Sequence, residues 1–256
     1  MTLDTRSEAA KFYDLNPDFP PDVSFYLDLI PSPDAAVLEL GCGTGRVTIP
    51  LARHCGFVYG LDLSPAMIRR CGTKLDQANI PPGQVVVSEG DITDFDLGRQ
   101  FDFILAPFRV LQNLETDEEV EGLLRCIRQH LAPGGTCVLN VFKPFCSPHE
   151  LRERWLTPGE QLDWEVPQTG GKVACYSRRS RLSEQRLVLY PDLIYRRYAG
   201  ATLVEEIVLH LVMRCYYPET FEKLITSQGF RILKRWGGYA GEAYGEGPEL
   251  VLQFEF

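Results

Sequence analysis

A carboxylate and three glycines stand at alternate positions near the start of the chain. Glu39, Gly41, Gly43 and Gly45 form the pattern Glu-x-Gly-x-Gly-x-Gly at the end of the apolar run AAVLEL. Glycines let the backbone turn tightly and approach a ligand closely, and the start of a helix offers free backbone N–H groups. The pattern therefore predicts a ligand-binding turn between a strand and a helix.

The spacing of the glycines distinguishes between classes of ligand. A dinucleotide fingerprint, Gly-x-Gly-x-x-Gly, needs glycine at position 46, where this chain has Arg46. A phosphate-binding loop needs Gly-Lys-Ser or Gly-Lys-Thr, which the turn lacks. A nicotinamide dinucleotide is thereby disfavoured, and an NAD-dependent oxidoreductase stays as the alternative interpretation.

Two acidic residues follow at the ends of later apolar runs. Asp62 stands about twenty residues beyond the glycines, where a carboxylate accepts hydrogen bonds from ribose hydroxyls. Asp91, in the segment EGDI, is placed to accept a hydrogen bond from an adenine amine, and Ile92 to press on the ring. Two such acids and a glycine turn fit a nucleoside ligand without phosphates, and S-adenosylmethionine (SAM) is such a ligand.

The elements that must position these residues alternate between strand and helix. From about residue 35 to 143, short apolar runs are separated by segments with helical periodicity. This alternation is typical of a parallel sheet with helices on both faces, which binds ligands at the carboxyl ends of its strands. Strands are expected at 35–40, 57–63, 84–92, 101–108 and 136–142, and helices at 45–55, 64–78 and 116–131.

The pattern changes from 144 to 217, where apolar and polar residues alternate at the strand period. Turn signals at Pro191-Asp192 and Ala199-Gly200 predict antiparallel strands in this segment. The predicted fold class is α/β: a doubly wound, mostly parallel, seven-stranded, Rossmann-like sheet with an antiparallel β insert. A final helix and two strands are expected at 218–228, 230–237 and 249–256.

We expect the chain to be organised in four segments. These are an N-terminal helical lid (1–34), a cofactor-binding α/β core (35–143), the antiparallel insert (144–217), and a final helix with two strands that complete the core sheet (218–256). The insert would serve as a substrate lid or as a subunit contact.

Five stretches resemble the successive motifs of the class I SAM-dependent methyltransferases in order and spacing. They are VLELGCGTGR (37–46), GLDLSPAMI (60–68), EGDITDF (89–95), FDFILAPF (101–108) and HLAPGGTCVLNVF (130–142). The resemblance covers 35–143 strongly and the last helix and strands weakly. It implies an enzyme that takes SAM as methyl donor and releases S-adenosylhomocysteine.

The resemblance also implies roles for individual residues. The glycines would shape a pocket for the methionine part of SAM, with Glu39 near its amino group. Asp62 would hold the ribose, Asp91 and Ile92 would hold the adenine, and Met67 would pack near that ring.

Further contacts are implied outside these motifs. The segments KFYDL and FYLDL resemble lid segments of the family, which makes Tyr13 and Tyr26 candidates to cover SAM. Cys42 is expected to be a small filler between the glycines and not a nucleophile. The cofactor contacts expected in all are Tyr13, Glu39, Gly41, Cys42, Gly43, Gly45, Asp62, Leu63, Met67, Gly90, Asp91, Ile92 and Pro107.

The chemistry of a sulfonium indicates what the acceptor needs. Its methyl group is transferred by in-line displacement, so the positioning of the acceptor matters most. A neutral amine needs no base and a hydroxyl gains from one, and we expect a small-molecule acceptor with an amine favoured. The segment APFRVLQNL lacks the Asp/Asn-Pro-Pro-Tyr/Phe motif of methyltransferases acting on nucleic-acid amines. His210 is the candidate base and Arg109 a second catalytic candidate. The expected substrate contacts are Tyr26, Phe108, Arg109, Gln112, Asn113 and Arg214.

The composition narrows the partners and the location. A formal net charge of -9 opposes binding to the phosphate backbone of nucleic acids. The 8 cysteines include no Cys-x-x-Cys pair, and no apolar run approaches the roughly 20 residues that span a bilayer. We therefore expect a cytoplasmic monomer or homodimer without nucleic-acid, membrane or metal partners. The non-catalytic alternative is a methyltransferase-like scaffold subunit.

Overall fold

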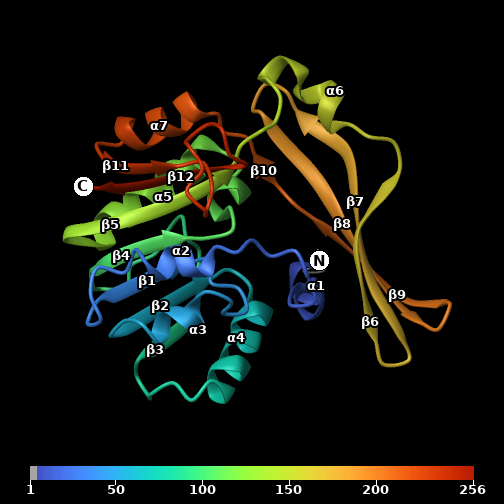
Figure 1. The fold of residues 1–256 in the computed structure, drawn as a ribbon, viewed down its shortest axis with the longest axis horizontal. Coiled ribbons are helices and arrows are strands. Elements are labelled where there is room, and N and C mark those ends of the chain that lie inside the picture. Colours follow the sequence, from blue (N-terminus) through green and yellow to red (C-terminus); the bar gives the residue numbers. More distant parts are fainter. Residues whose placement is uncertain (1–4) are drawn as a thin grey trace. The chain divides into compact units, whose positions relative to one another are not determined.

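The computed structural model describes residues 5–256, which divide into two compact units (Figure 1). The core unit comprises residues 20–145 and 215–256. The insert unit comprises residues 146–214 together with the N-terminal residues up to Phe19. Each unit has its own sheet.

The segment predicted as an N-terminal lid, 1–34, is divided between the units. Its residues 1–4 lie outside the described residues. Its first helix, α1 (Thr5–Tyr13), belongs to the insert unit, and its second, α2 (Val23–Leu27), belongs to the core unit.

The core unit contains a seven-stranded sheet in the order β11-β12-β5-β4-β1-β2-β3. Neighbouring strands among β1 to β5 pair in parallel, whereas β12 pairs antiparallel with both β5 and β11. This topology confirms the predicted doubly wound, mostly parallel sheet. The strands are β1 (Ala36–Leu40), β2 (Phe57–Asp62), β3 (Val85–Glu89), β4 (Phe101–Ala106), β5 (Leu131–Phe142), β11 (Arg231–Trp236) and β12 (Glu249–Glu255).

The helices of the core unit begin at residues suited to that position. Ser64 caps the fourth helix by accepting a hydrogen bond from the Met67 backbone, and Pro65 occupies the first helical turn. Thr116 and Glu119 form a capping box at the start of the fifth helix. These helices are α3 (Thr48–Ala52), α4 (Pro65–Gln77), the 3-10 helix η1 (Val110–Asn113), α5 (Asp117–His130) and α7 (Pro218–Ser227).

The helix after the glycine turn is shorter than predicted. The sequence favoured a helix over 45–55, but α3 spans only Thr48–Ala52. Gly45 has φ +84, outside the helical region, so the helix cannot begin until the chain has left the turn.

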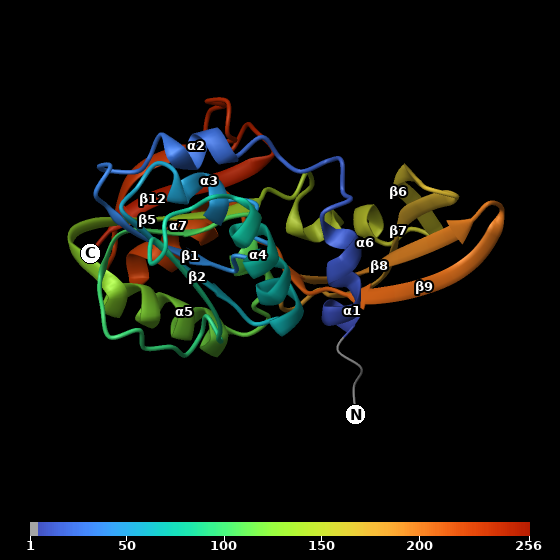
Figure 2. The ribbon, with the colours of Figure 1, turned by 90° about the horizontal axis from the view of Figure 1, so that it is seen from below.

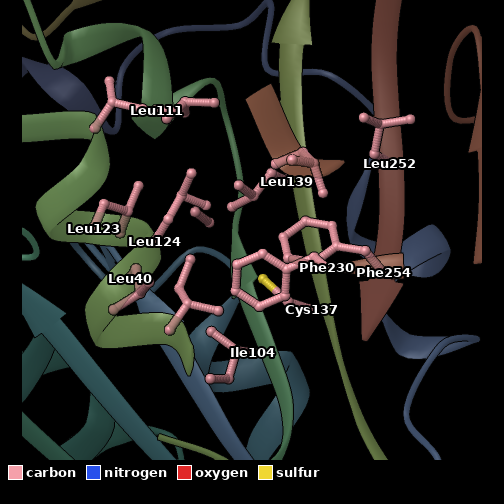
Figure 3. Close-up of a cluster of buried hydrophobic side chains, with 14 of the residues drawn as sticks. Leu40, Ile104, Leu111, Leu123, Leu124, Cys137, Leu139, Phe230, Leu252 and Phe254 are labelled. Carbon is pink, nitrogen blue, oxygen red and sulfur yellow. The ribbon is translucent and has the colours of Figure 1, made fainter. Parts of the chain in front are cut away.

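Two hydrophobic layers cover the core sheet. Side chains from α5 and α7 pack with one face of the sheet, and side chains from α2 and α3 pack with the other. Figure 2 shows α2 and α3 on one side of the sheet and α5 on the opposite side. Figure 3 shows the first layer, in which the Phe230 ring meets the Phe254 ring edge-on at 5.0 Å between centroids.

The insert unit is an antiparallel sheet of five strands, in which β8 pairs with β7, β9 and β10. Helix α1 packs against it, and the ring of Phe12 stacks on the ring of Tyr195 at 5.6 Å between centroids. The strands are β6 (Glu160–Gln168), β7 (Gly171–Ser183), β8 (Val188–Ala199), β9 (Thr202–His210) and β10 (Met213–Arg214), preceded by η2 (Pro148–Glu150) and α6 (Leu151–Trp155).

One predicted turn of the insert is wrong, because Pro191-Asp192 lies inside β8. The partner strand β7 has a bulge between Arg178 and Arg181, opposite the proline. Proline is tolerated in a strand where the ladder is interrupted in this way, since its missing N–H leaves no partner unsatisfied. The carbonyl of Pro191 still accepts a hydrogen bond from the Leu211 backbone.

Other structural features bear on the class of protein. The 8 cysteines are free thiols. Within residues 5–256, no helix is both long and apolar enough to cross a lipid bilayer. The same residues contain no group of three or more His, Cys, Asp or Glu side chains arranged to hold a metal ion.

Candidate cofactor and acceptor site

The glycine turn between β1 and α3 is tightly packed on two sides and open on the third. Gly41, Gly43 and Gly45 all have positive φ, at +73, +55 and +84. A Cβ on Gly41 would lie 2.5 Å from Cγ2 of Val110, and a Cβ on Gly45 would lie 2.7 Å from Sγ of Cys71. A Cβ on Gly43 would meet no atom within 4 Å, so this side of the turn has room for a ligand.

Glu39 is a buried carboxyl at the carboxyl end of β1. Its residue is 1% exposed, and the Thr48 hydroxyl donates a hydrogen bond to its Oε2 at 2.6 Å. Burial raises the pKa of Glu39 to about 8, although the Thr48 hydrogen bond and the charge of Arg46 oppose this effect. Near neutral pH this carboxyl therefore holds a proton that an approaching cation would displace.

Asp62 ties the ends of neighbouring strands to the glycine turn. Its carboxylate accepts hydrogen bonds from the backbone N–H groups of Gly43, at 2.8 Å, and Ser64, at 2.9 Å. Its carbonyl accepts a hydrogen bond from the Gly90 backbone at 3.0 Å, which brings the end of β3 alongside. The strand ends that were predicted to bind a nucleoside thus converge.

The residues expected around adenine line the same edge of the sheet. Asp91 is exposed, and its Oδ1 accepts hydrogen bonds from the backbone and the hydroxyl of Thr93, each at 2.8 Å. Leu63 is 58% exposed after β2, while Met67 is buried on α4. Ile92 is partly buried against the α5 side of the core.

Cys42 lies behind the glycine turn. Its buried thiol faces β2, because a Cβ on Gly60 would lie 2.9 Å from its Sγ. A hydrogen bond with Cys71 and burial raise the pKa of this thiol far above its ordinary value. A thiol held neutral in this way is a weak nucleophile.

The segment after β4 contains four of the six predicted acceptor contacts. Pro107 is buried, and Phe108 and Arg109 adopt positive φ values of +56 and +65. Gln112 is buried and accepts a hydrogen bond from the Phe142 backbone at 2.7 Å. Asn113 is exposed and donates to the carbonyl of Val110 at 3.3 Å.

Arg109 is bound by residues that the sequence did not single out. Its Nε donates to Oε1 of Glu249 at 3.0 Å, and Asn140 donates to the other oxygen of that carboxylate at 3.0 Å. Tyr26 is fully buried, and its hydroxyl donates to Oδ1 of Asn140 at 3.3 Å. Polar residues inside apolar strands, as in TCVLNVF and ELVLQFEF, were the signal that could have identified Asn140 and Glu249.

Arg46, which replaces the third glycine of a dinucleotide fingerprint, also has a structural partner. Its guanidinium forms a bidentate ion pair with the buried carboxylate of Asp22, with Nη2 2.9 Å from Oδ2. The same guanidinium lies over the ring of Phe108, 5.5 Å from its centroid. Arg46 therefore links α2 to the segment after β4.

Three predicted site residues belong to the insert unit. Tyr13 ends α1, with its ring 5.1 Å from the ring of Phe19, and Arg214 lies in β10. His210 is exposed at the end of β9, and its Nδ1 lies 2.6 Å from Oδ1 of Asp192. Burial alone would raise the pKa of Asp192, but hydrogen bonds from His210 and Arg178 outweigh this effect and lower that pKa.

Two glycine substitutions should separate packing from ligand binding. Gly41→Ala is expected to lower the free energy of unfolding by about 1–3 kcal/mol through backbone strain, and further through its clash with Val110. Gly43→Ala meets no neighbour, so we expect only the strain, together with weaker cofactor binding. Urea unfolding and calorimetric titration with S-adenosylhomocysteine would measure both quantities. Equal destabilisation by the two variants would contradict the packing role of Gly41.

Comparisons of the sequence with known proteins point in one direction. A family model described as a methyltransferase domain matches residues 37–135. The chain is 30% identical over 233 residues to the dTDP-3-amino-3,4,6-trideoxy-alpha-D-glucopyranose N,N-dimethyltransferase of Streptomyces venezuelae, covering 88% of each chain. It is 29% identical over 211 residues to the dTDP-3-amino-3,6-dideoxy-alpha-D-glucopyranose N,N-dimethyltransferase of Streptomyces fradiae, covering 82% of this chain and 76% of that one.

Solved structures share the fold over nearly the whole chain. A SAM-dependent methyltransferase from Clostridium acetobutylicum superimposes with a TM-score of 0.76 at 16% identity, covering 98% of this chain and 97% of that one. An amino pentose methyltransferase from Micromonospora echinaspora, solved with SAM bound, gives a TM-score of 0.70 at 25% identity, covering 99% and 98%.

Proposed function

The chain belongs to the class I SAM-dependent methyltransferases, and we propose that it transfers a methyl group from SAM to the amine of an amino sugar linked to a nucleotide. The observation that carries the substrate class is the 30% identity to an amino-sugar N,N-dimethyltransferase over 88% of both chains. Two further relatives are named for N,N-dimethylation of amino-deoxy sugars, which supports the same acceptor chemistry.

The residues at the strand ends fit the cofactor. The open side of Gly43 leaves room for the methionine part, and the buried carboxyl of Glu39 suits an ammonium group. Asp62 would accept hydrogen bonds from the ribose, and Asp91 from the adenine amine. When bound, SAM supplies a methyl group already activated by its sulfonium.

The contribution proposed for the protein is positioning and exclusion of water. The segment from Pro107 to Asn113 would align the acceptor nitrogen with the methyl group. An amine that arrives neutral has its own lone pair for the displacement, so the transfer needs no base on the protein. For an acceptor hydroxyl a base would be required, and His210, held by Asp192, is the candidate.

The location, the oligomeric state and the partners of the protein are also proposals. We propose a cytoplasmic enzyme with a small-molecule acceptor that acts as a monomer or homodimer, without a nucleic-acid or membrane partner. The formal net charge of -9 and the 8 free cysteines support this setting.

Calorimetric titration with SAM, S-adenosylhomocysteine and NAD, followed by a transfer assay, tests the proposed function. We expect binding of both adenosyl ligands and none of NAD, and methylation of dTDP-3-amino-3,6-dideoxyglucose. The matched control acceptor carries a hydroxyl in place of the 3-amino group and should remain unmethylated. Binding of SAM without transfer to the amino sugar would overturn the acceptor class. Failure to bind either adenosyl ligand would favour the scaffold alternative.

A further inference from the structure

Two adjacent residues after β4 adopt a backbone conformation that their side chains disfavour. Phe108 has φ +56, and Arg109 has φ +65 and ψ 28, in the left-handed region. Elsewhere in residues 5–256, only Asn79 and Leu187 among the non-glycine residues have positive φ. Such conformations persist where the surrounding structure enforces them, and they cluster at functional sites.

A buried pair of polar residues enforces this turn. Asn140 on β5 accepts a hydrogen bond from the Arg109 backbone N–H at 3.2 Å. Glu249 on β12 accepts from Nε of the same arginine at 3.0 Å, and Asn140 donates to Glu249 at 3.0 Å. Backbone and side chain of Arg109 are thus both fixed from neighbouring strands.

Stability alone does not account for this buried polar pair. Asn140 is 0% and Glu249 4% exposed, in strands whose buried side chains are mostly apolar. A buried carboxylate paired with a partly exposed arginine gives little net stability compared with apolar side chains of similar size. The geometry that the pair imposes is therefore the more informative property.

That geometry places the Phe108–Arg109 turn directly against the glycine turn. Val110, the next residue, lies so close to Gly41 that a Cβ there would be 2.5 Å from its Cγ2. The ring of Phe108 is in turn packed under the guanidinium of Arg46, which follows the glycines. The residues around Phe108 therefore border the place where the methyl group is expected.

We propose that Asn140 and Glu249 are positioning residues, which hold the Phe108–Arg109 turn in its left-handed conformation so that it orients the methyl acceptor. The inference rests on the proposed function, because it assigns the turn to the acceptor side of the same site. It gives Arg109 a structural task through Glu249 in place of direct contact with the acceptor.

The test combines Glu249→Ala with a substitution that removes the strain at Arg109. In Glu249→Ala, we expect faster hydrogen exchange over residues 107–113 and a fall in kcat on the order of 100-fold with dTDP-3-amino-3,6-dideoxyglucose, because the reacting atoms are misplaced. Affinity for SAM should be unchanged. The matched control is Glu255→Ala, on the same strand as Glu249, which removes a surface ion pair to Arg231 on β11. It should alter neither the exchange over residues 107–113 nor kcat.

Adding Arg109→Gly to Glu249→Ala decides between positioning and contact. Glycine adopts the left-handed region without strain, so the double variant should regain most of the lost turnover. If turnover in the double variant stays as low as in Glu249→Ala, with the fold intact, the proposal is overturned in favour of direct contact by Arg109. Unchanged exchange over 107–113 in Glu249→Ala would also overturn it. If wild-type protein binds SAM but does not methylate the amino sugar, the proposed function fails, and the exchange experiment still tests the turn.

Discussion

The Asp62→Ala variant is expected to raise the dissociation constant of SAM by about 10- to 100-fold. Hydrogen bonds to a charged group contribute roughly 1.5–3 kcal/mol each, and the proposed ribose contacts would be lost with the carboxylate. The substitution also releases the backbone N–H groups of Gly43 and Ser64, so the glycine turn loses its link to β2. Calorimetric titration with SAM and S-adenosylhomocysteine measures the effect.

The matched control for this variant is Asp76→Ala, which removes an exposed carboxylate from α4. It lowers the net negative charge equally, so any long-range effect on the cationic ligand is shared. SAM affinity close to wild type in both variants would contradict the assignment of Asp62 to the cofactor. Equal losses in both would indicate a general electrostatic effect.

The strands and helices of 35–143 and the glycine turn could be predicted from sequence because they depend on residues close together in the chain. Strand and helix periods in 35–143 predicted the parallel sheet, and the glycine spacing predicted the turn. The position of Asp62 beside the glycine turn could be predicted because the carboxyl ends of neighbouring parallel strands meet at one edge. Each of these inferences needs only a few consecutive residues and a rule about sheets.

The side-chain pairs and the backbone turn after β4 depend instead on contacts between distant segments. Glu249 and Arg109 are far apart in the chain, and their pairing follows from β12 lying beside β5. The left-handed Phe108–Arg109 turn has no glycine to announce it, so the sequence offers no local signal. The bounds of strand β6 also have no local signal, since Trp164 is its one buried side chain and its apolar periodicity is weak.

Arg46 shows how one residue can carry both kinds of information. Its identity argued against a dinucleotide, because a glycine is needed at that position. Its partner Asp22 emerged only with the fold, as a buried carboxylate before α2. The ion pair joins the residue before α2 to the glycine turn, so the geometry of that turn depends on α2 as well as on the strand ends.

The pH dependence of Glu39 gives the last prediction. Burial, the hydrogen bond from the Thr48 hydroxyl, and the charges of Arg46, Cys71 and Asp62 all act on its carboxyl. Burial dominates and raises its pKa to about 8, from 4.5 for an unperturbed group. A raised folded-state pKa stabilises the ligand-free protein at low pH, and this contribution is lost as the pH rises from about 4.5 to about 8.

Cofactor binding should have the opposite dependence. The ammonium group of SAM favours the ionised carboxylate, so binding below about pH 8 releases a proton and tightens by up to about tenfold per pH unit. Above about pH 8 the ligand's α-amino group loses its own proton, and affinity should fall again. Calorimetry in buffers of different ionisation enthalpy would count the released proton.

Glu39→Gln separates the protein's titration from the ligand's. The variant should bind SAM more weakly at its best pH and lose the rise in affinity on the acid side, while it keeps the fall on the alkaline side. The carboxamide preserves the size of the side chain and its hydrogen bond from Thr48, so the fold should be retained. A wild-type affinity that does not change below about pH 8 would mean that Glu39 is already ionised before SAM binds. An already ionised carboxylate would still attract the cationic cofactor, but it would give the affinity no dependence on pH in this range.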